Sequence, residues 1–310
     1  MKKIFLPLCL LCSFATATAV AAPDANATVR APAGSSEIVI KTTARLAGAI
    51  DSITWNGKEF INSFDHGRQL QSAANLDCGT PITAETFNPT EAGSRNDGRG
   101  TNSTSQLLKL RAEKNELETT VKMAFWLAPG QKSGVNLAKN TTLLSEHLVT
   151  KRVHIGYKNL PNVISYDVTF TVPPGEHHTH AVFEALTGYM PPEFSQFLKF
   201  NPKTGNYEAM TDGPGEIPEP VVLAVPGGSH AMGIYAPPQP APKTTGPTFG
   251  RFRFVPQKVV KWNCVFRVTD KTNGIQPGEY TYRMFVIVGS LKDVHDSLRA
   301  LEQEFSPSSK

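Results

Sequence analysis

Alternation of apolar and polar side chains along residues 164–172 constrains the fold of this chain more than any other feature. Every second position from Ile164 to Val172 is apolar, and the positions between them are Ser, Asp or Thr. A period of two is typical of a β-strand with one buried and one solvated face. The same alternation recurs in shorter segments, at residues 38–40, 48–55 and 121–127. The sequence therefore predicts a protein built mainly of strands.

Turn and cap signals extend this prediction to the whole chain. Asn56-Gly57 between alternating apolar residues is typical of a tight hairpin. Ser290 can cap a helix, because apolar residues then recur at helical spacing. Many short strands and one helix predict an all-β fold, a large antiparallel β-sandwich with a C-terminal helix, which forms a single domain over residues 36–306. Residues 22–35, rich in Ala, Pro, Gly and Ser, are expected to form a flexible leader.

The N-terminus has the pattern of a secretion signal. Lys2 and Lys3 precede an apolar run at residues 4–14, and small residues at 19–21 suit cleavage. We expect residues 1–21 to be a signal peptide, and the protein to be periplasmic or secreted. An uncleaved anchor is the alternative. The later sequence contains no apolar stretch long enough to cross a membrane, so no membrane association is expected after the signal is removed.

Charge and motif content exclude several classes of function. Without the two signal lysines, 29 basic residues face 27 acidic ones, and the chain contains no basic run, so nucleic acid is not an expected partner. The sequence lacks a nucleophile elbow, a P-loop and a His-Glu-x-x-His motif, which argues against a serine hydrolase, a nucleotide enzyme or a zincin. No cofactor is predicted.

Two cysteines remain after the signal, Cys78 and Cys264. In an exported chain such a pair can form a disulfide, which would close a long loop. Two separate buried thiols are the alternative, because spacing alone does not show that the residues meet.

One hairpin resembles a known superfamily. It reads Gly48-x-Ile50-x-Ser52-Ile53 followed by Asn56-Gly57-Lys58-Glu59. This pattern is similar to the opening hairpin of galactose-mutarotase-like proteins, and the segment from His66 to Arg68 looks like polar cleft segments of carbohydrate-active members. The resemblance implies a supersandwich fold, found in aldose epimerases and in domains of glycoside hydrolases and polysaccharide lyases.

The first candidate constellation lies in residues 65–71, within a long stretch of little periodicity. His66 titrates near neutral pH and can move a proton. Arg68 offers a planar fork to a carboxylate or to paired hydroxyls, and Gln71 adds a further polar group for a substrate. The alternative is a turn in which Asp65 pairs with Arg68 and His66 is solvated.

The second constellation is Asn88-Pro89-Thr90-Glu91 and the residues that follow it. Pro89 fixes its own backbone and favours an extended Asn88, which would hold Glu91 in a defined direction. Glu91 could then serve as acid, base or nucleophile, with Asn88 binding substrate. The alternative is a polar loop whose side chains bond their own backbone.

The third constellation follows Pro173. If residues 176–184 form a strand, His178, His180 and Glu184 share one face. A histidine could be a catalytic base oriented by Glu184, and Tyr189 could bind substrate at the rim. His-x-His with a carboxylate can also bind zinc, although we predict no metal site. A polar groove wall is the third possibility.

These segments together predict a secreted carbohydrate-active enzyme that cleaves glycosidic bonds of a polysaccharide or oligosaccharide, either by hydrolysis or by elimination. A non-catalytic glycan-binding protein of the same fold, an aldose-epimerase-like enzyme and a structural exported domain are the alternatives. The enzyme hypothesis requires the three segments to converge on one cleft.

Overall fold

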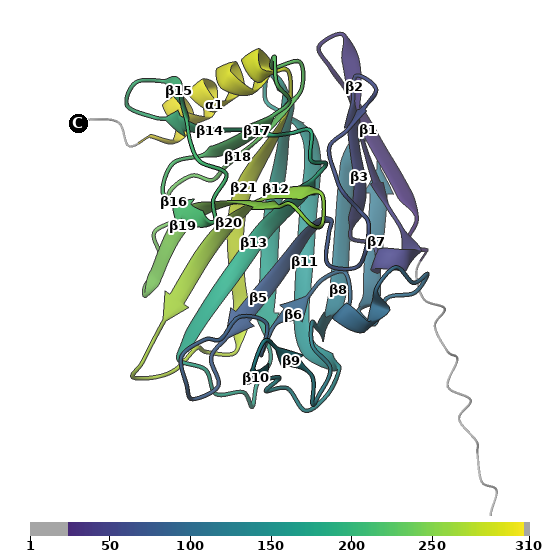
Figure 1. Ribbon diagram of the computed structural model, residues 1–310, viewed down its shortest axis with the longest axis vertical. Coiled ribbons are helices and arrows are strands. Elements are labelled where there is room, and N and C mark those ends of the chain that lie inside the picture. The colour runs from purple at the N-terminus through teal and green to yellow at the C-terminus, as the bar shows by residue number, and fades with distance from the viewer. Residues whose placement is uncertain (1–23, 307–310) are drawn as a thin grey trace, which may run out of the picture.

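The computed structural model of the 310-residue chain describes residues 24–306, so the predicted signal peptide lies outside the described residues. The chain is composed mainly of strands with one C-terminal helix, α1 (Leu291–Phe305) (Figure 1). The strands are, in chain order, β1 (Ala27–Ala33), β2 (Ser36–Thr42), β3 (Ile50–Trp55), β4 (Lys58–Glu59), β5 (Leu70–Leu76), β6 (Pro89–Thr90), β7 (Gln106–Glu113), β8 (Glu116–Phe125), β9 (Lys132–Ser133), β10 (Asn136–Leu137), β11 (Leu144–Tyr157), β12 (Leu160–Val172), β13 (His180–Met190), β14 (Gln196–Asn201), β15 (Asn206–Ala209), β16 (Gly215–Ile217), β17 (Val221–Ala224), β18 (Ala231–Tyr235), β19 (Thr244–Phe254), β20 (Val259–Thr269) and β21 (Gly278–Gly289).

The strands pair antiparallel in two long ladders that pack against each other. One ladder runs β1-β2-β3-β5-β13-β20-β19-β16. The other runs β7-β8-β11-β12-β21-β18-β17-β14-β15. The short strand β6 pairs with both β5 and β8 and so joins the ladders. The predicted all-β antiparallel sandwich with a C-terminal helix is confirmed.

Aromatic rings from both ladders meet in the core. Phe170 of β12 packs against Phe183 of β13 with ring centroids 4.9 Å apart, and Phe266 of β20 stacks on Tyr282 of β21 at 4.2 Å. All four side chains are buried. Burial of a large aromatic side chain contributes roughly 2–3 kcal/mol, so this contact between the ladders is a main source of stability.

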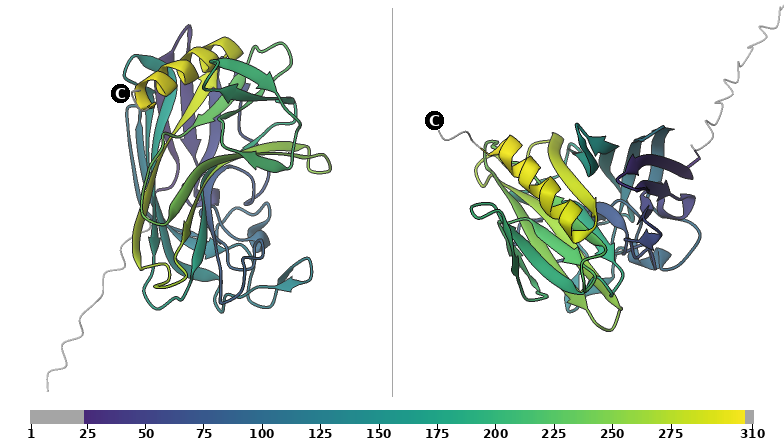
Figure 2. Two further views of the ribbon diagram at one scale, coloured as in Figure 1. Left: turned by 90° about the vertical axis from the view of Figure 1, so that its left-hand side faces the viewer. Right: turned by 90° about the horizontal axis from the view of Figure 1, so that it is seen from above.

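Helix α1 crosses one end of the sandwich, where Figure 2 shows it above the strands. Its buried residues Val294, Leu298 and Leu301 belong to a second apolar cluster with side chains of β12, β18 and β21. The predicted cap is present: Ser290 N donates to the Asp293 carboxylate at 2.9 Å, and Asp293 N donates to Ser290 Oγ at 3.2 Å. No helix of residues 24–306 is long and apolar enough to traverse a lipid bilayer.

The structure confirms the predicted hairpin at Asn56-Gly57 and corrects the predicted flexible leader at residues 22–35. Asn56 and Gly57 both have positive φ and connect β3 to β4, as an Asn-Gly hairpin turn requires. Within the expected leader, however, residues 27–33 form β1, because Val29 and Ala33 bury their side chains while the strand pairs with β2. Cys78 and Cys264 are both free thiols, so they form no disulfide.

Candidate functional site

A groove lies over three neighbouring strands of the first ladder, β5, β13 and β20. Side chains that point away from the core form its floor. They are Gln71, Ala73 and Asn75 of β5, Glu184, Thr187 and Tyr189 of β13, and Lys261 of β20. A β-bulge after Glu184 places both Ala185 and Leu186 in the core, so that Thr187 returns to the groove side. We call this pocket the sheet groove.

Loops form the walls of the sheet groove. Ala84, Glu85, Asn88 and Thr90 approach from one segment, while Gly67 and Trp126 complete the lining. Gly67 is required here, because a Cβ atom at this position would lie 2.7 Å from Cη2 of Trp126. The volume of the groove is about 230 Å³.

Glu184 is the most strongly positioned ionisable group of the sheet groove. Its Oε2 accepts hydrogen bonds from Thr187 Oγ1 at 2.9 Å and from Lys261 Nζ at 3.1 Å. Asn263 Nδ2 donates to the same oxygen at 3.4 Å, whereas Oε1 accepts no hydrogen bond from any residue in the range 24–306. The Glu184 side chain is 22% exposed. One carboxylate oxygen is therefore held by the protein, and the other is available to a ligand.

The charge of this cluster is set by its neighbours. Burial by itself would raise the pKa of Glu184, but the Lys261 ammonium and the hydrogen bonds from Thr187, Lys261 and Asn263 outweigh it and lower that pKa. Burial likewise opposes the charge of Lys261, yet Glu184 and Tyr189 raise the Lys261 pKa. Glu184 is thus held as a carboxylate, which accepts hydrogen bonds and is poorly suited to act as a general acid.

Gln71 and Asn88 line the sheet groove and also hold its parts together. Gln71 Nε2 donates to Gly67 O at 3.2 Å, and its Oε1 accepts from Ala92 N at 3.3 Å. Asn88 Nδ2 donates to Ala74 O at 2.5 Å. These amides fix the first two predicted segments against β5.

Tyr189 also lies in the sheet groove, whereas Arg68 is engaged beside it. Lys261 Nζ lies 5.2 Å from the centroid of the Tyr189 ring. Arg68 pairs with Asp65 at 2.8 Å, the contact expected if this segment is a structural turn, and donates to Gln257 O at 3.3 Å. The Arg68 side chain is not part of the groove lining.

His66 is a buried structural residue rather than a groove side chain. It is 1% exposed. Its Nδ1 lies 2.9 Å from Gly98 O and its Nε2 lies 2.7 Å from Arg45 O. Both contacts are hydrogen bonds only if both ring nitrogens carry protons. The position leaves no nitrogen facing a substrate, so we do not retain His66 as a catalytic candidate.

Glu91 is also enclosed by protein. Its side chain is fully buried, Oε1 lies 2.6 Å from Lys151 Nζ, and Oε2 accepts from Ser72 N at 2.9 Å. A carboxylate in this position cannot reach a ligand in the sheet groove. The contacts assign Glu91 to fixing the wall segment onto β5 and β11.

His178 and His180 lie outside the sheet groove. His178 Nε2 and His147 Nε2 lie 2.9 Å and 2.7 Å from the same oxygen of Glu176. His180 Nδ1 contacts Thr269 Oγ1 at 2.7 Å. Only Glu184 of the third segment reaches the sheet groove, and residues 24–306 contain no group of three or more His, Cys, Asp or Glu side chains arranged to hold a metal ion.

The convergence that the enzyme hypothesis requires is therefore partial. Each segment contributes to the sheet groove, through Gln71, Asn88 and Glu184, but the predicted histidines and Glu91 do not. Sequence reasoning missed Trp126, Lys261 and Glu85. Alternation along residues 259–265 could have placed Lys261 on the face opposite Trp262, whereas nothing in the sequence relates Trp126 to Gly67.

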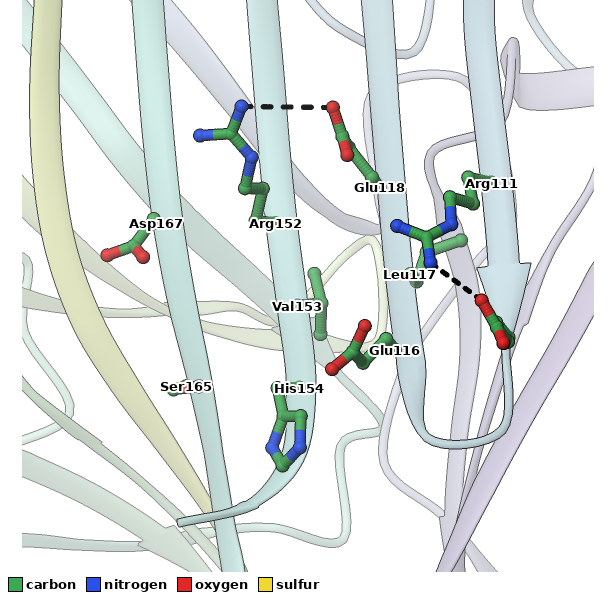
Figure 3. A pocket seen from close by; sticks show the side chains of 10 residues that line it. Arg111, Glu116, Leu117, Glu118, Arg152, Val153, His154, Ser165 and Asp167 are labelled. Atoms are coloured by element: carbon green, nitrogen blue, oxygen red, sulfur yellow. Dashed lines mark hydrogen bonds and ion pairs between the residues drawn. The ribbon is translucent and has the colours of Figure 1, made fainter.

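Another pocket lies on the outer face of β8, β11 and β12 (Figure 3). Its charged side chains pair with one another: Arg111 contacts Glu113 at 2.6 Å, and Arg152 lies 3.9 Å from Glu118. Asp167 binds Arg283 at 2.7 Å. Because these charges are mutually compensated on an exposed strand face, the sheet groove is the better candidate site.

Comparisons with known proteins do not assign a family. No protein-family model matches the chain, and no curated protein matches it. Among solved structures, an alpha-mannosidase from Enterococcus faecalis V583 aligns with 87% of this chain and 30% of its own, with a TM-score of 0.49 and 10% identity. The GH36 alpha-galactosidase AgaB from Geobacillus stearothermophilus aligns with 89% and 42%, with a TM-score of 0.43 and 10% identity.

A third similar structure is the Slr1438 protein from Synechocystis sp. PCC 6803. It aligns over 89% of this chain and 100% of its own, with a TM-score of 0.45 and 8% identity. This chain spans less than half the length of the two glycosidases. At these identities the similarity concerns the arrangement of the strands, and function has to be argued from the sheet groove.

Proposed function

We propose that the sheet groove binds a carbohydrate, either an oligosaccharide or a segment of a polysaccharide. The observation that carries this proposal is Glu184, which offers a free carboxylate oxygen beside Lys261 in a groove that Trp126 also lines. Sugars present many hydroxyl groups and also apolar ring faces. Fixed acceptors and donors next to an aromatic ring match both properties.

Binding is tested on an array of neutral and uronate oligosaccharides with the full-length mature protein. The wild type is expected to bind a defined set of glycans, and Glu184→Gln and Asn75→Ala are expected to weaken that binding. Arg152→Gln is the matched control, because it removes a charge from the outer pocket and leaves the sheet groove intact. No glycan binding by the wild type, or equal binding by all variants, would contradict the proposal.

Hydrolysis of a glycosidic bond is the second candidate function, because two carboxylates, Glu184 and Glu85, line the same groove. Glycoside hydrolysis uses two such groups, one as nucleophile or base and one as acid. Its lowered pKa keeps Glu184 ionised, as a nucleophile requires, and Glu85 would then be the acid. Elimination has less support, because Lys261 is already paired with Glu184 and no histidine lines the groove.

Mass spectrometry of the products distinguishes these reactions. Products that have gained water, absent with Glu184→Gln and with Glu85→Gln, would identify a hydrolase. Unsaturated products would identify a lyase. Unchanged glycans that still bind would identify a binding protein without catalytic activity.

Export remains part of the proposal. The positive start, the short apolar run and the small residues at 19–21 support cleavage after residue 21 and a periplasmic or secreted mature protein. N-terminal sequencing of the protein recovered from the cell exterior or periplasm is expected to start at Ala22. Recovery of the uncleaved chain in the cytoplasm would contradict this.

A further inference from the structure

We propose that the carbohydrate ligand is a chain longer than the sheet groove and that it continues over an aromatic track formed by Phe252 and Phe254 on the β19–β20 hairpin. This inference rests on the proposed function and names the substrate class as an extended glycan. The groove volume of about 230 Å³ is below the range of roughly 300–1,000 Å³ usual for pockets that enclose a drug-sized ligand. A longer chain must therefore leave the groove across its rim.

The track is continuous with the groove through Lys261. The Lys261 ammonium lies 5.2 Å from the ring centroid of Tyr189, which lines the groove, and 5.2 Å from the ring centroid of Phe252, which does not. One side chain thus bridges the groove floor and the first ring of the hairpin. Its position over both rings is that of a cation–π contact.

The two hairpin rings lie parallel to each other, and the outer ring, that of Phe254, is exposed. Phe252 and Phe254 occupy alternate positions of β19, and their rings are nearly parallel, with an interplanar angle of 5° and centroids 6.0 Å apart. Phe254 is 37% exposed and the adjacent Val255 is 72% exposed. Gly250 makes room for this arrangement, because a Cβ atom there would lie 2.9 Å from Phe252 Cε2. An exposed aromatic ring at the rim of a polar groove offers a platform for the apolar face of a sugar.

The hairpin is fixed beside the groove. Arg68 donates to Gln257 O at the hairpin tip at 3.3 Å, and Arg253 packs over the Phe197 ring at 5.3 Å. This contact assigns Arg68 to positioning the track, because Arg68 belongs to the segment that also supplies Gly67 and Gln71 to the groove.

The test is a length series of the glycan identified on the array, from disaccharide to octasaccharide, titrated into the full mature protein. Phe252→Ala/Phe254→Ala is expected to lose roughly tenfold in affinity for the longest chains and none for the disaccharide. Val255→Ala is the matched control, because it removes exposed apolar surface from the same hairpin without removing a ring. If the double variant does not fold, Phe254→Ala alone is titrated instead, after its melting temperature has shown that it folds. Phe254→Tyr keeps an aromatic ring and is expected to retain binding.

The outcomes separate this inference from the proposed function. If the ring variants bind every length as the wild type does, while Glu184→Gln loses binding, the track is overturned and the groove assignment stands. Equal loss for short and long chains would also overturn it, because a separate track affects only long ones. If the wild type binds no glycan of any length, both proposals fall.

Discussion

Glu91 Oε1 lies 2.6 Å from Lys151 Nζ inside the core, with the two side chains 0% and 1% exposed. The pair connects the loop that carries Asn88 and Thr90 to β11 of the opposite ladder. Because Glu91 also accepts a hydrogen bond from Ser72 N, the wall of the sheet groove is anchored to its floor through a buried charge.

Removing one member of this pair is expected to lower the free energy of unfolding. Lys151→Met leaves the Glu91 carboxylate buried without its cation, and loss of one partner of a buried pair costs about 3–5 kcal/mol. Urea unfolding is expected to show that loss for Lys151→Met and for Glu91→Gln. The double variant Glu91→Gln/Lys151→Met is expected to lose less free energy of unfolding than the two single variants lose in sum. Strict additivity of the losses would show that the two groups are not coupled.

The cluster of Glu176, His147 and His178 predicts a pH dependence of stability. Burial by itself would lower the pKa of His178, but hydrogen bonds with Cys78, Glu176 and the backbone of Asp77 raise it from 6.5 to about 10. Its stabilising contribution is therefore complete below pH 6.5 and is lost as the pH rises through 10. Burial opposes the charge of Glu176, yet both histidines lower its pKa from 4.5 to about 2, so this contribution is present above pH 4.5 and is lost as the pH falls through 2.

Glu176→Gln tests this dependence. Relative to the wild type, its loss in free energy of unfolding is expected to be larger at about pH 5.5 than at about pH 9.5. The exposed neighbour His177 provides the control, since His177→Gln removes an imidazole outside the cluster. A deficit that is independent of pH would contradict the charge assignment.

Lys261 is predicted to keep Glu184 ionised. In Lys261→Met, burial is no longer offset by the ammonium, so the pKa of Glu184 should rise. Carbon-detected NMR of the Glu184 carboxyl measures this directly. Lys261→Arg keeps the charge and is expected to keep the pKa low. An unchanged Glu184 pKa in Lys261→Met would contradict this prediction, because the hydrogen bonds from Thr187 and Asn263 would then be sufficient to keep the pKa low.

Trp126 is predicted to contact bound sugar. Trp126→Ala should weaken glycan affinity by roughly 1 kcal/mol, or about fivefold, because it removes the largest aromatic ring of the groove. In the wild type, addition of glycan should change the tryptophan fluorescence. Trp55 and Trp262 are buried, so Trp126→Ala should no longer show this change. Unaltered affinity would place the sugar away from this wall.

The strands were predictable because alternation is a local property. Residues 164–172 lie within β12, and Asn56 and Gly57 form the predicted turn with positive φ angles. The site was harder to predict, because orientation and enclosure depend on distant partners. Nothing near His66 in sequence shows that the carbonyl oxygens of Arg45 and Gly98 enclose it.

Glu91 illustrates the same limit. A glutamate in a polar loop suggests exposure. The Glu91 side chain is buried because the Lys151 side chain of β11 points into the core and pairs with its carboxylate. Glu184 could be placed correctly on a strand face, but its partner Lys261 follows it by 77 positions in the chain. Pairing of β13 with β20 brings them together.

Amide hydrogen exchange of the wild-type protein, with and without the glycan it binds most tightly, tests the central claim most directly. We predict new protection in β5, β13 and β20 and in the segment from Ala84 to Thr90, with no change in β8 and β11. Protection confined to the outer pocket, or to the His178 region, would contradict the assignment of the sheet groove as the binding site.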